Sequence, residues 1–394
     1  MMKTRLAVIF FILSVTVNSL ARIPQLSHFS DISIITCDPG DEALYAAFGH
    51  SAIRVYDPEN NIDLAFNYGV FDFNQPNFYL NFAKGYLNYK LGVREFSDFL
   101  YAYQYYDRTV REQVLQLTYD QKTAVFQFLM ENARPENCYY YYDYFYDNCA
   151  TRVWDVFEKV LGASITLDET YVVTGQSFRD LVNIYTREQL WGDFGIDVCL
   201  GLPMDKELAP KEFMFLPDYI FKGFEYTTIQ MGATAIPIVR STGVVYQKRG
   251  HEQETSFLTP NVTFWSLAIL ILLLTFASMK WKMDLRVFDQ IWFITMGLLG
   301  LFLTLLWTAT DHNAASGNLN IFWAIPFHFP AALMLAFRKG GRIMLSYFRW
   351  TSIWCILLMI CWHWIPQGYN PAFFPIVLVS CARGWAITDR LSKA

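Results

Sequence analysis

Two stretches of the chain decide the fold of its N-terminal half: YFYDNCATRVWD (residues 144–155) and FGHSAIRV (residues 48–55). After Asn148, apolar residues recur at helical spacing, so the first stretch predicts a helix with Asp147 or Asn148 as its N-cap and Cys149 in its first turn. The positive end of a helix dipole favours thiolate over thiol, and the thiolate is the nucleophilic form of cysteine. Cys149 is therefore a candidate catalytic nucleophile.

The second stretch supplies a candidate base. Alternating apolar and polar residues predict a strand that begins at His50, and a second strand over residues 62–70 completes a hairpin. Asn67 and Asp63 are candidates for the polar group that fixes the imidazole tautomer, and Asn67 is preferred because it lies near the open end of the hairpin. The competing interpretation is a buried apolar cysteine, a structural histidine and an ordinary strand asparagine.

Composition divides the chain into an exported part and a membrane part. The chain has 394 residues, of which 54% are hydrophobic, and its long apolar runs lie in residues 1–21 and 262–388. Residues 22–260 have an ordinary globular composition that is rich in Tyr and Phe. The net charge of −5 and the lack of a basic stripe argue against a nucleic-acid partner.

The N-terminus is typical of a secretory signal. The basic start Met1–Arg5 precedes a short apolar run, and small residues surround Ala21. We expect cleavage after Ala21, with an uncleaved N-terminal anchor as the alternative. The expected regions are a signal peptide (1–21), an exported domain (22–260) and a transmembrane domain (261–394).

The seven cysteines specify neither a disulfide nor a metal site. Four of them fall in the exported part, and a bond among Cys37, Cys138 and Cys199 could form in an oxidising compartment, but no spacing selects a pair. The sequence has no CxxC pair and no HExxH motif, so we expect neither a metal nor another cofactor.

The other exported segments predict a mixture of strands and helices. Residues 32–36 predict a strand, and residues 42–48 predict one or two helical turns. Residues 108–131, with a second start at Asp120, and residues 178–190 predict two helices. Residues 71–110 are dense in Phe and Tyr. We expect these rings to pack in a core, although they could instead line a groove for acyl chains.

Five apolar runs are candidate membrane spans: residues 262–279, 291–309, 321–337, 350–365 and 371–387. The loops on one side of these runs carry Lys and Arg, and the loops on the other side carry none. By the positive-inside rule, the exported domain lies outside the cytoplasm. Arg383 weakens the fifth run, and we expect this side chain to snorkel to the cytoplasmic face.

Four polar residues are candidates for substrate binding. Asn148 and Arg152 flank Cys149, and the arginine could hold a phosphate or carboxylate. His312 and Asn320 lie in a loop on the same side of the membrane as Cys149, where they could position a lipid headgroup or an incoming amine. Paired arginines and loop residues that cap helices are the commoner outcomes.

Taken with its topology, the chain resembles the Lnb class of bacterial lipoprotein N-acyltransferases. The resemblance rests on FGHSAIR (residues 48–54), YDNCATR (residues 146–152) and the five C-terminal spans, and it extends from about residue 30 to the C-terminus. It implies an α+β exported domain of permuted papain-like (NlpC/P60-like) fold, followed by an all-α bundle of about five transmembrane helices. It also implies a bacterial inner-membrane protein whose periplasmic domain uses Cys149 as nucleophile and His50 as base.

The function that this resemblance implies is acyl transfer between lipids. Cys149 would accept an acyl chain from a membrane phospholipid as a thioester, and the α-amino group of a diacylglyceryl-cysteine lipoprotein would receive it. Two alternatives stay open: a membrane-anchored papain-like hydrolase of peptidoglycan or peptides, and a non-enzymatic membrane protein that binds lipid or a partner. Loss of the gene would leave lipoprotein N-acylation intact for a hydrolase, and Cys149→Ser would have no effect on a binding protein.

Overall fold

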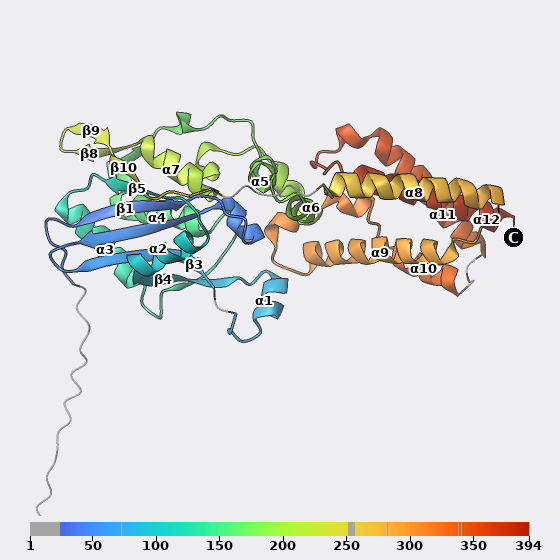
Figure 1. The fold of residues 1–394 in the computed structure, drawn as a ribbon, viewed down its shortest axis with the longest axis horizontal. Coiled ribbons are helices and arrows are strands. Elements are labelled where there is room, and N and C mark those ends of the chain that lie inside the picture. Colours follow the sequence, from blue (N-terminus) through green and yellow to red (C-terminus); the bar gives the residue numbers. More distant parts are fainter. Residues whose placement is uncertain are drawn as a thin grey trace, which may run out of the picture.

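The computed structural model describes residues 24–71, 73–250, 257–281, 283–337, 339 and 341–393 (Figure 1). An α/β domain at the N-terminal end is followed by a bundle of long helices at the C-terminal end. Helices α5 (Phe178–Thr186) and α6 (Leu190–Cys199) lie where the two parts meet. The expected signal peptide, residues 1–21, lies outside the described residues.

A seven-stranded antiparallel sheet forms the centre of the N-terminal domain. Its strands follow the order β10–β5–β1–β2–β3–β4–β6. The predicted hairpin is confirmed, because β2 pairs antiparallel with β3. The strand bounds are β1 Asp31–Cys37, β2 His50–Asp57, β3 Ile62–Val70, β4 Asn88–Glu95, β5 Val110–Leu115, β6 Tyr139–Tyr141 and β10 Val239–Tyr246.

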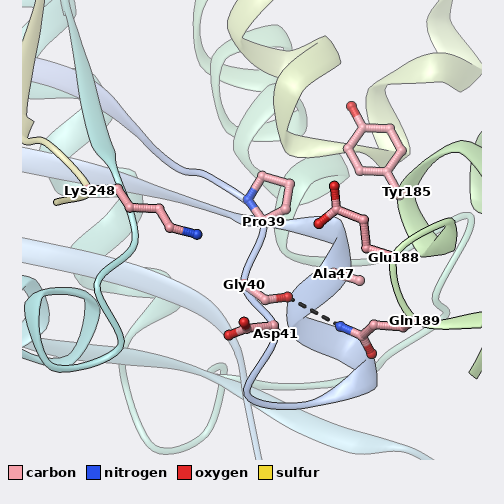
Figure 2. Close-up of a pocket in the computed structure, with 8 residues that line it drawn as sticks. All are labelled: Pro39, Gly40, Asp41, Ala47, Tyr185, Glu188, Gln189 and Lys248. Atoms are coloured by element: carbon pink, nitrogen blue, oxygen red, sulfur yellow. Dashed lines mark hydrogen bonds between the residues drawn. The ribbon is translucent and has the colours of Figure 1, made fainter. Parts of the chain in front are cut away.

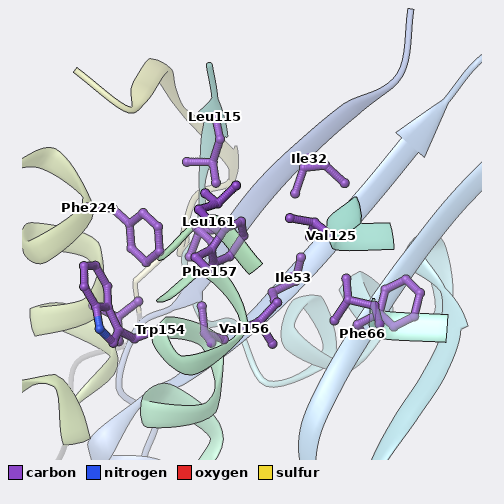
Figure 3. Packing of buried hydrophobic residues seen from close by; sticks show 14 of the residues in the cluster. Ile32, Ile53, Phe66, Leu115, Val125, Trp154, Val156, Phe157, Leu161 and Phe224 are labelled. Carbon is purple, nitrogen blue, oxygen red and sulfur yellow. The ribbon is translucent and has the colours of Figure 1, made fainter. Parts of the chain in front are cut away.

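Helices cover both faces of this sheet. Side chains alternate between the faces, so Ile34 of β1 packs with α3, α4 and α7, whereas Ile35 packs with α2. Figure 3 shows the larger core, in which Phe157 of α4 and Phe224 of α7 meet the sheet residue Ile53. The helix bounds are α2 Phe96–Tyr105, α3 Tyr119–Asn132, α4 Cys149–Leu161 and α7 Pro217–Glu225.

The predicted helix over residues 108–131 is wrong in its first half. Strand β5 occupies part of that segment and pairs with β1 on one side and β10 on the other. Helix α3 begins only after Thr118, whose side chain forms a capping box with Gln121. An extended segment between two strands satisfies its backbone polar groups on both sides, and this tertiary pairing overrides local helix propensity.

The remaining described elements of the N-terminal domain are short. Three strands form a second sheet in the order β7–β8–β9. Helix α4 ends before Gly162 as predicted, and the predicted helix over residues 178–190 proves to be α5 followed by the start of α6. The new bounds are α1 Phe78–Lys84, β7 Ile165–Leu167, β8 Thr227–Met231 and β9 Thr234–Pro237, with a 3₁₀ turn (η1) at Leu44–Phe48.

The C-terminal region is helical and apolar. Three of its helices, α8, α9 and α11, are long and apolar enough to cross a membrane. The predicted third span proves to be a 3₁₀ turn followed by the shorter helix α10, so the five-span arrangement stays a prediction. The bounds are α8 Pro260–Trp281, α9 Arg286–Thr308, α10 His328–Ala336, α11 Gly341–Ile360 and α12 Phe373–Ser392.

The inter-helix loops that contact the N-terminal domain are the loops without basic residues. Loop 309–327 donates the Asn318 amide to Val198 of α6 at 2.8 Å, and loop 361–372 donates the Gly368 N–H to Asp205 at 2.7 Å. Neither loop contains Lys or Arg. These contacts place the N-terminal domain on the non-basic side of the bundle, which agrees with the positive-inside rule.

The expectation that Arg383 snorkels to the membrane surface is wrong. This side chain is 2% exposed, and its Nε donates to Asp289 of α9 at 2.7 Å. A second guanidinium N–H donates to Thr275 of α8 at 2.9 Å. The acidic partner within the bundle removes the need to reach water, because a paired and hydrogen-bonded charge is tolerated in an apolar interior.

A buried ionic cluster joins the two parts of the molecule. Arg179 of α5 contacts Asp197 of α6 at 2.7 Å and Asp205 at 2.8 Å. The bundle loop 361–372 adds the Asn370 amide, which donates to Asp197 at 3.0 Å, and the Gly368 N–H on Asp205. We call Arg179, Asp197, Asp205 and Asn370 the joint cluster, and its bonds fix the domain to the outer ends of the membrane helices.

Candidate active site

The N-terminus of α4 is built by Asn148. Its side-chain oxygen accepts the N–H groups of Ala150 and Thr151 at 2.8 and 3.0 Å, as an N-cap does. Its side-chain nitrogen donates to the carbonyl groups of Tyr144 and Phe215, each at 2.8 Å. The cap thus leaves Cys149 as the first helical residue, and within the described residues no hydrogen bond is recorded for the Cys149 N–H.

Two neighbouring strands separate to receive this helix end. The β2–β3 ladder stops at the pair Ile53 and Phe66, although both strands continue. Gly69, with φ of +88°, lies in the separated part of β3, and a Cβ there would lie 3.5 Å from the Cβ of Cys149. Glycine therefore allows both the left-handed backbone and the close approach of the cysteine. The backbone N–H of Ser51 in β2 interacts with the Cys149 sulfur.

The structure brings Cys149, His50 and Asn67 together. The Cys149 thiol is hydrogen-bonded to the His50 imidazole. The His50 Nε2 atom lies 2.6 Å from the amide oxygen of Asn67, which can only accept, so Nε2 carries a proton and Nδ1 remains for the sulfur. Cys149 is 8% exposed and His50 is half-buried, so the pair lies at the margin of the core.

The pKa values of Cys149 and His50 are shifted in opposite directions. Burial alone would raise the pKa of Cys149, but the His50 charge and hydrogen bond, the Ser51 N–H and the Tyr142 hydroxyl together lower that pKa. Burial alone would likewise lower the pKa of His50, and the charge of Cys149 together with bonds to Cys149 and Asn67 raises it. Opposite shifts in adjacent groups favour proton transfer from sulfur to nitrogen.

Tyr142 is a site residue that sequence reasoning missed. Its hydroxyl is hydrogen-bonded to the Cys149 thiol, and burial raises the pKa of Tyr142 well above its ordinary value, so it stays a donor. The visible signal was a run of six tyrosines within residues 139–146. No spacing rule selects one ring from such a run, because the choice depends on how β6 leads into the helix.

The other predicted site residues make contacts within the chain. Arg152 pairs with Asp147 and stacks over the Tyr140 ring at 4.3 Å. The Asn320 amide donates to two carbonyl groups of α6 at 2.9 and 3.0 Å and accepts from Trp323. Asn148 and Asn320 have their polar atoms engaged in these internal bonds, and their roles in substrate binding stay predictions.

The structure places His312 where a bundle loop meets α1. Its Nε2 donates to the Phe82 carbonyl of α1 at 3.1 Å, so it connects a bundle loop to the N-terminal domain.

All seven cysteines lie in the described residues, and all are free thiols. The structure therefore contains no disulfide among Cys37, Cys138 and Cys199.

A polar surface pocket lies next to η1 (Figure 2). Its walls carry Asp41 and Glu188 as well as Lys248, and the Gln189 amide donates across it to the Gly40 carbonyl at 3.3 Å. The reactive pair does not line this pocket. Because neither Cys149 nor His50 lines it, we do not assign the chemistry of the protein to this pocket.

Fold and site together define a membrane protein in which an α/β domain presents a cysteine–histidine pair beside an apolar helical bundle. The Lnb N-terminal periplasmic domain matches residues 27–183, and the Lnb transmembrane domain matches residues 252–392. The two matches support an Lnb-type family for this chain, with a periplasmic domain followed by a membrane domain. No curated protein and no solved structure gave a significant match.

Proposed function

We propose that the protein is a lipoprotein N-acyltransferase that carries its acyl group on Cys149. The observation that supports this most is the hydrogen-bonded Cys149–His50 pair at the start of α4, in a domain bonded to the outer ends of membrane helices. The two Lnb domains suggest the same type of function. The arrangement of Cys, His and Asn is that of a papain-like enzyme with the histidine earlier in the chain.

The first half of the proposed reaction forms a thioester. The Cys149 thiolate attacks the carbonyl carbon of a phospholipid ester, and the free Cys149 N–H stabilises the oxyanion that forms. Tyr142 is close enough to the sulfur to act as a second donor. As the ester C–O bond breaks, the leaving alkoxide takes the proton of the His50 imidazolium, which releases a lysophospholipid.

The second half transfers the acyl group to an amine. The neutral α-amino group of a diacylglyceryl-cysteine attacks the thioester carbonyl, and neutral His50 accepts the proton that the nitrogen loses. The C–S bond breaks and the thiolate returns, so the cycle needs no further reactant. Asn67 keeps the His50 ring oriented in both halves through its 2.6 Å bond to Nε2.

The location of the site explains why a membrane anchor helps. Both substrates are lipids of the same leaflet, and the tether raises their effective concentration at the site. We place the domain, about residues 22–260, in the periplasm of a bacterial inner membrane, with phospholipid as donor and diacylated lipoprotein as acceptor.

Mass spectrometry of lipoprotein N-terminal peptides tests this function. A strain that depends on this gene should lose the amide-linked acyl chain when the gene carries Cys149→Ser, and regain it with the wild-type gene. Retention of N-acylation would favour the hydrolase instead. If Cys149→Ser supports the biological effect as well as the wild type does, the protein is not an enzyme.

A further inference from the structure

Helix α1 leaves the sheet and reaches the helical bundle (Figure 1). The Asp311 N–H donates to the Lys84 carbonyl at 2.8 Å, and His312 donates to the Phe82 carbonyl. A Cβ on Gly85 would lie 2.8 Å from the Asp311 backbone, so the two loops are in close contact. Asp311 lies three residues beyond the last residue of the apolar helix α9, and α1 is therefore held level with the outer end of a candidate membrane span.

The surface of the α1 region is apolar. We call residues 73–88, between β3 and β4, the aromatic lip. No residue of α1 is buried, and Tyr79 is 77% and Leu80 54% exposed. Phe73, Phe82 and Tyr86 add exposures of 59%, 41% and 46%. The segment contains one Lys and neither Asp nor Glu. An apolar surface of this kind is unusual on a part of a protein that faces water.

Ring contacts connect the lip to the reactive sulfur. Phe73 and Phe78 lie 5.0 and 6.4 Å from the ring of Phe71. Phe71 lies 5.2 Å from Tyr89, and Tyr89 lies 4.6 Å from Tyr142, whose hydroxyl is bonded to the Cys149 thiol. The rings form an unbroken sequence from the exposed lip to the nucleophile.

The level of the lip relative to a bilayer favours a lipid occupant. Aromatic side chains gather where a membrane meets water, because their rings are apolar and their polar atoms reach the headgroups. Trp364, in the second loop on this side of the bundle, is 78% exposed and fits the same belt. A soluble protein partner would have to displace lipid to reach a surface at this depth.

We propose that the aromatic lip inserts into the outer leaflet and passes the acyl chain of a phospholipid along Phe71, Tyr89 and Tyr142 to Cys149. The proposal rests on the acyl-transfer function for its last step only, because the membrane contact follows from the position and composition of the lip. The aromatic lip thus forms the binding site for the phospholipid donor. This site belongs to the N-terminal domain and not to the helices that anchor the protein.

Photo-cross-linking tests the membrane contact without requiring turnover. Benzoylphenylalanine is placed at Tyr79 or, as the matched control, at Tyr226, which is 47% exposed and precedes β8 at the end of the domain far from the bundle (Figure 1). Both full-length proteins are irradiated in vesicles of phosphatidylethanolamine and phosphatidylglycerol. We expect phospholipid adducts at position 79 at least tenfold above those at 226. Equal yields at the two positions would overturn the proposal.

A paired substitution tests the delivery step. In Tyr79→Asp/Leu80→Asp, we expect acylation of Cys149 by phospholipid vesicles to slow at least tenfold, while alkylation of Cys149 by water-soluble iodoacetamide keeps its rate. Unchanged acylation would refute the delivery role. If wild-type Cys149 is never acylated but position 79 cross-links to lipid, the membrane contact stands and the acyl-transfer function fails instead.

Discussion

Two buried polar clusters of this molecule, the joint cluster and the cluster around Cys149, show how the same kinds of interaction serve different purposes. In the joint cluster, Arg179 meets two carboxylates, and N–H groups of the bundle loop donate to the same two carboxylates. Around Cys149, the thiol faces one imidazole that lowers its pKa, and the helix-start N–H beside them has no recorded partner in the described residues. The satisfied cluster holds two parts together, whereas the cluster around Cys149 leaves one backbone N–H for a substrate oxygen.

The largest expected effect is a loss of acyl transfer when the cluster around Cys149 is altered. Cys149→Ser should lower acyl transfer by at least about 10³-fold, because loss of the nucleophile removes the covalent step. The free energy of unfolding should change by less than about 1 kcal/mol, since serine is nearly isosteric. Activity assays in vesicles and thermal unfolding check both values. Substantial residual transfer would mean that another group carries the acyl chain.

The next largest effect is a loss of stability when the joint cluster is altered. Arg179→Met should lower the free energy of unfolding by about 3–5 kcal/mol, because two buried carboxylates lose their cation. The matched control is Lys211→Met, which breaks the exposed pair with Glu158 and should cost less than about 1 kcal/mol. Denaturation of the full chain in detergent measures both. An equal loss of unfolding free energy in the two variants would contradict the stabilising role assigned to the joint cluster.

A smaller effect is expected from the orienting residue. Asn67→Ala should reduce acyl transfer roughly 10- to 100-fold, because His50 keeps its chemistry but loses its fixed orientation. Asn67→Asp should restore part of the rate, since a carboxylate can accept the same Nε2–H. If alanine has no effect, the 2.6 Å bond is structural only.

The pH dependence is the finest of these tests. Because the pKa of Cys149 is lowered, iodoacetamide should still alkylate the thiolate at pH values below those of an ordinary thiol, and this reactivity should fall as the pH drops through the Cys149 pKa. Acyl transfer should also fall at high pH, as the raised pKa of His50 is passed and the imidazolium loses its proton. His50→Gln should shift the alkylation profile to higher pH. An unshifted profile would show that His50 does not activate the sulfur.

Local signals in the sequence were sufficient for the elements that carry the reactive pair. A helix capped by Asp147 or Asn148 and a strand that begins at His50 follow from short patterns. The structure confirms both elements and selects Asn148 as the cap. Strand β5 could not be foreseen, because its pairing partners are distant in the chain. Arg383 was misjudged for the same reason, since its partner Asp289 lies on another helix.

The aromatic segment shows where composition alone reaches its limit. Phe99 packs under the sheet as expected for a core residue, but Tyr79 is largely exposed. Both belong to one Phe- and Tyr-rich stretch. The contact of α1 with the loop after α9 sets Tyr79 apart from Phe99. That contact joins residues more than two hundred positions apart, so local sequence patterns do not reveal it. Tyr142 was missed in the same way, because the six tyrosines of residues 139–146 are equivalent until the backbone conformation distinguishes them.

Intact-protein mass spectrometry after incubation with phospholipid vesicles tests the central claim most directly. The account predicts one fatty-acyl adduct on Cys149, removed by neutral hydroxylamine, lost on adding a diacylated lipoprotein peptide, and slower to form in His50→Gln. Transfer of acyl chains to lipoprotein without any adduct on Cys149, or with an adduct confined to another residue, would contradict it.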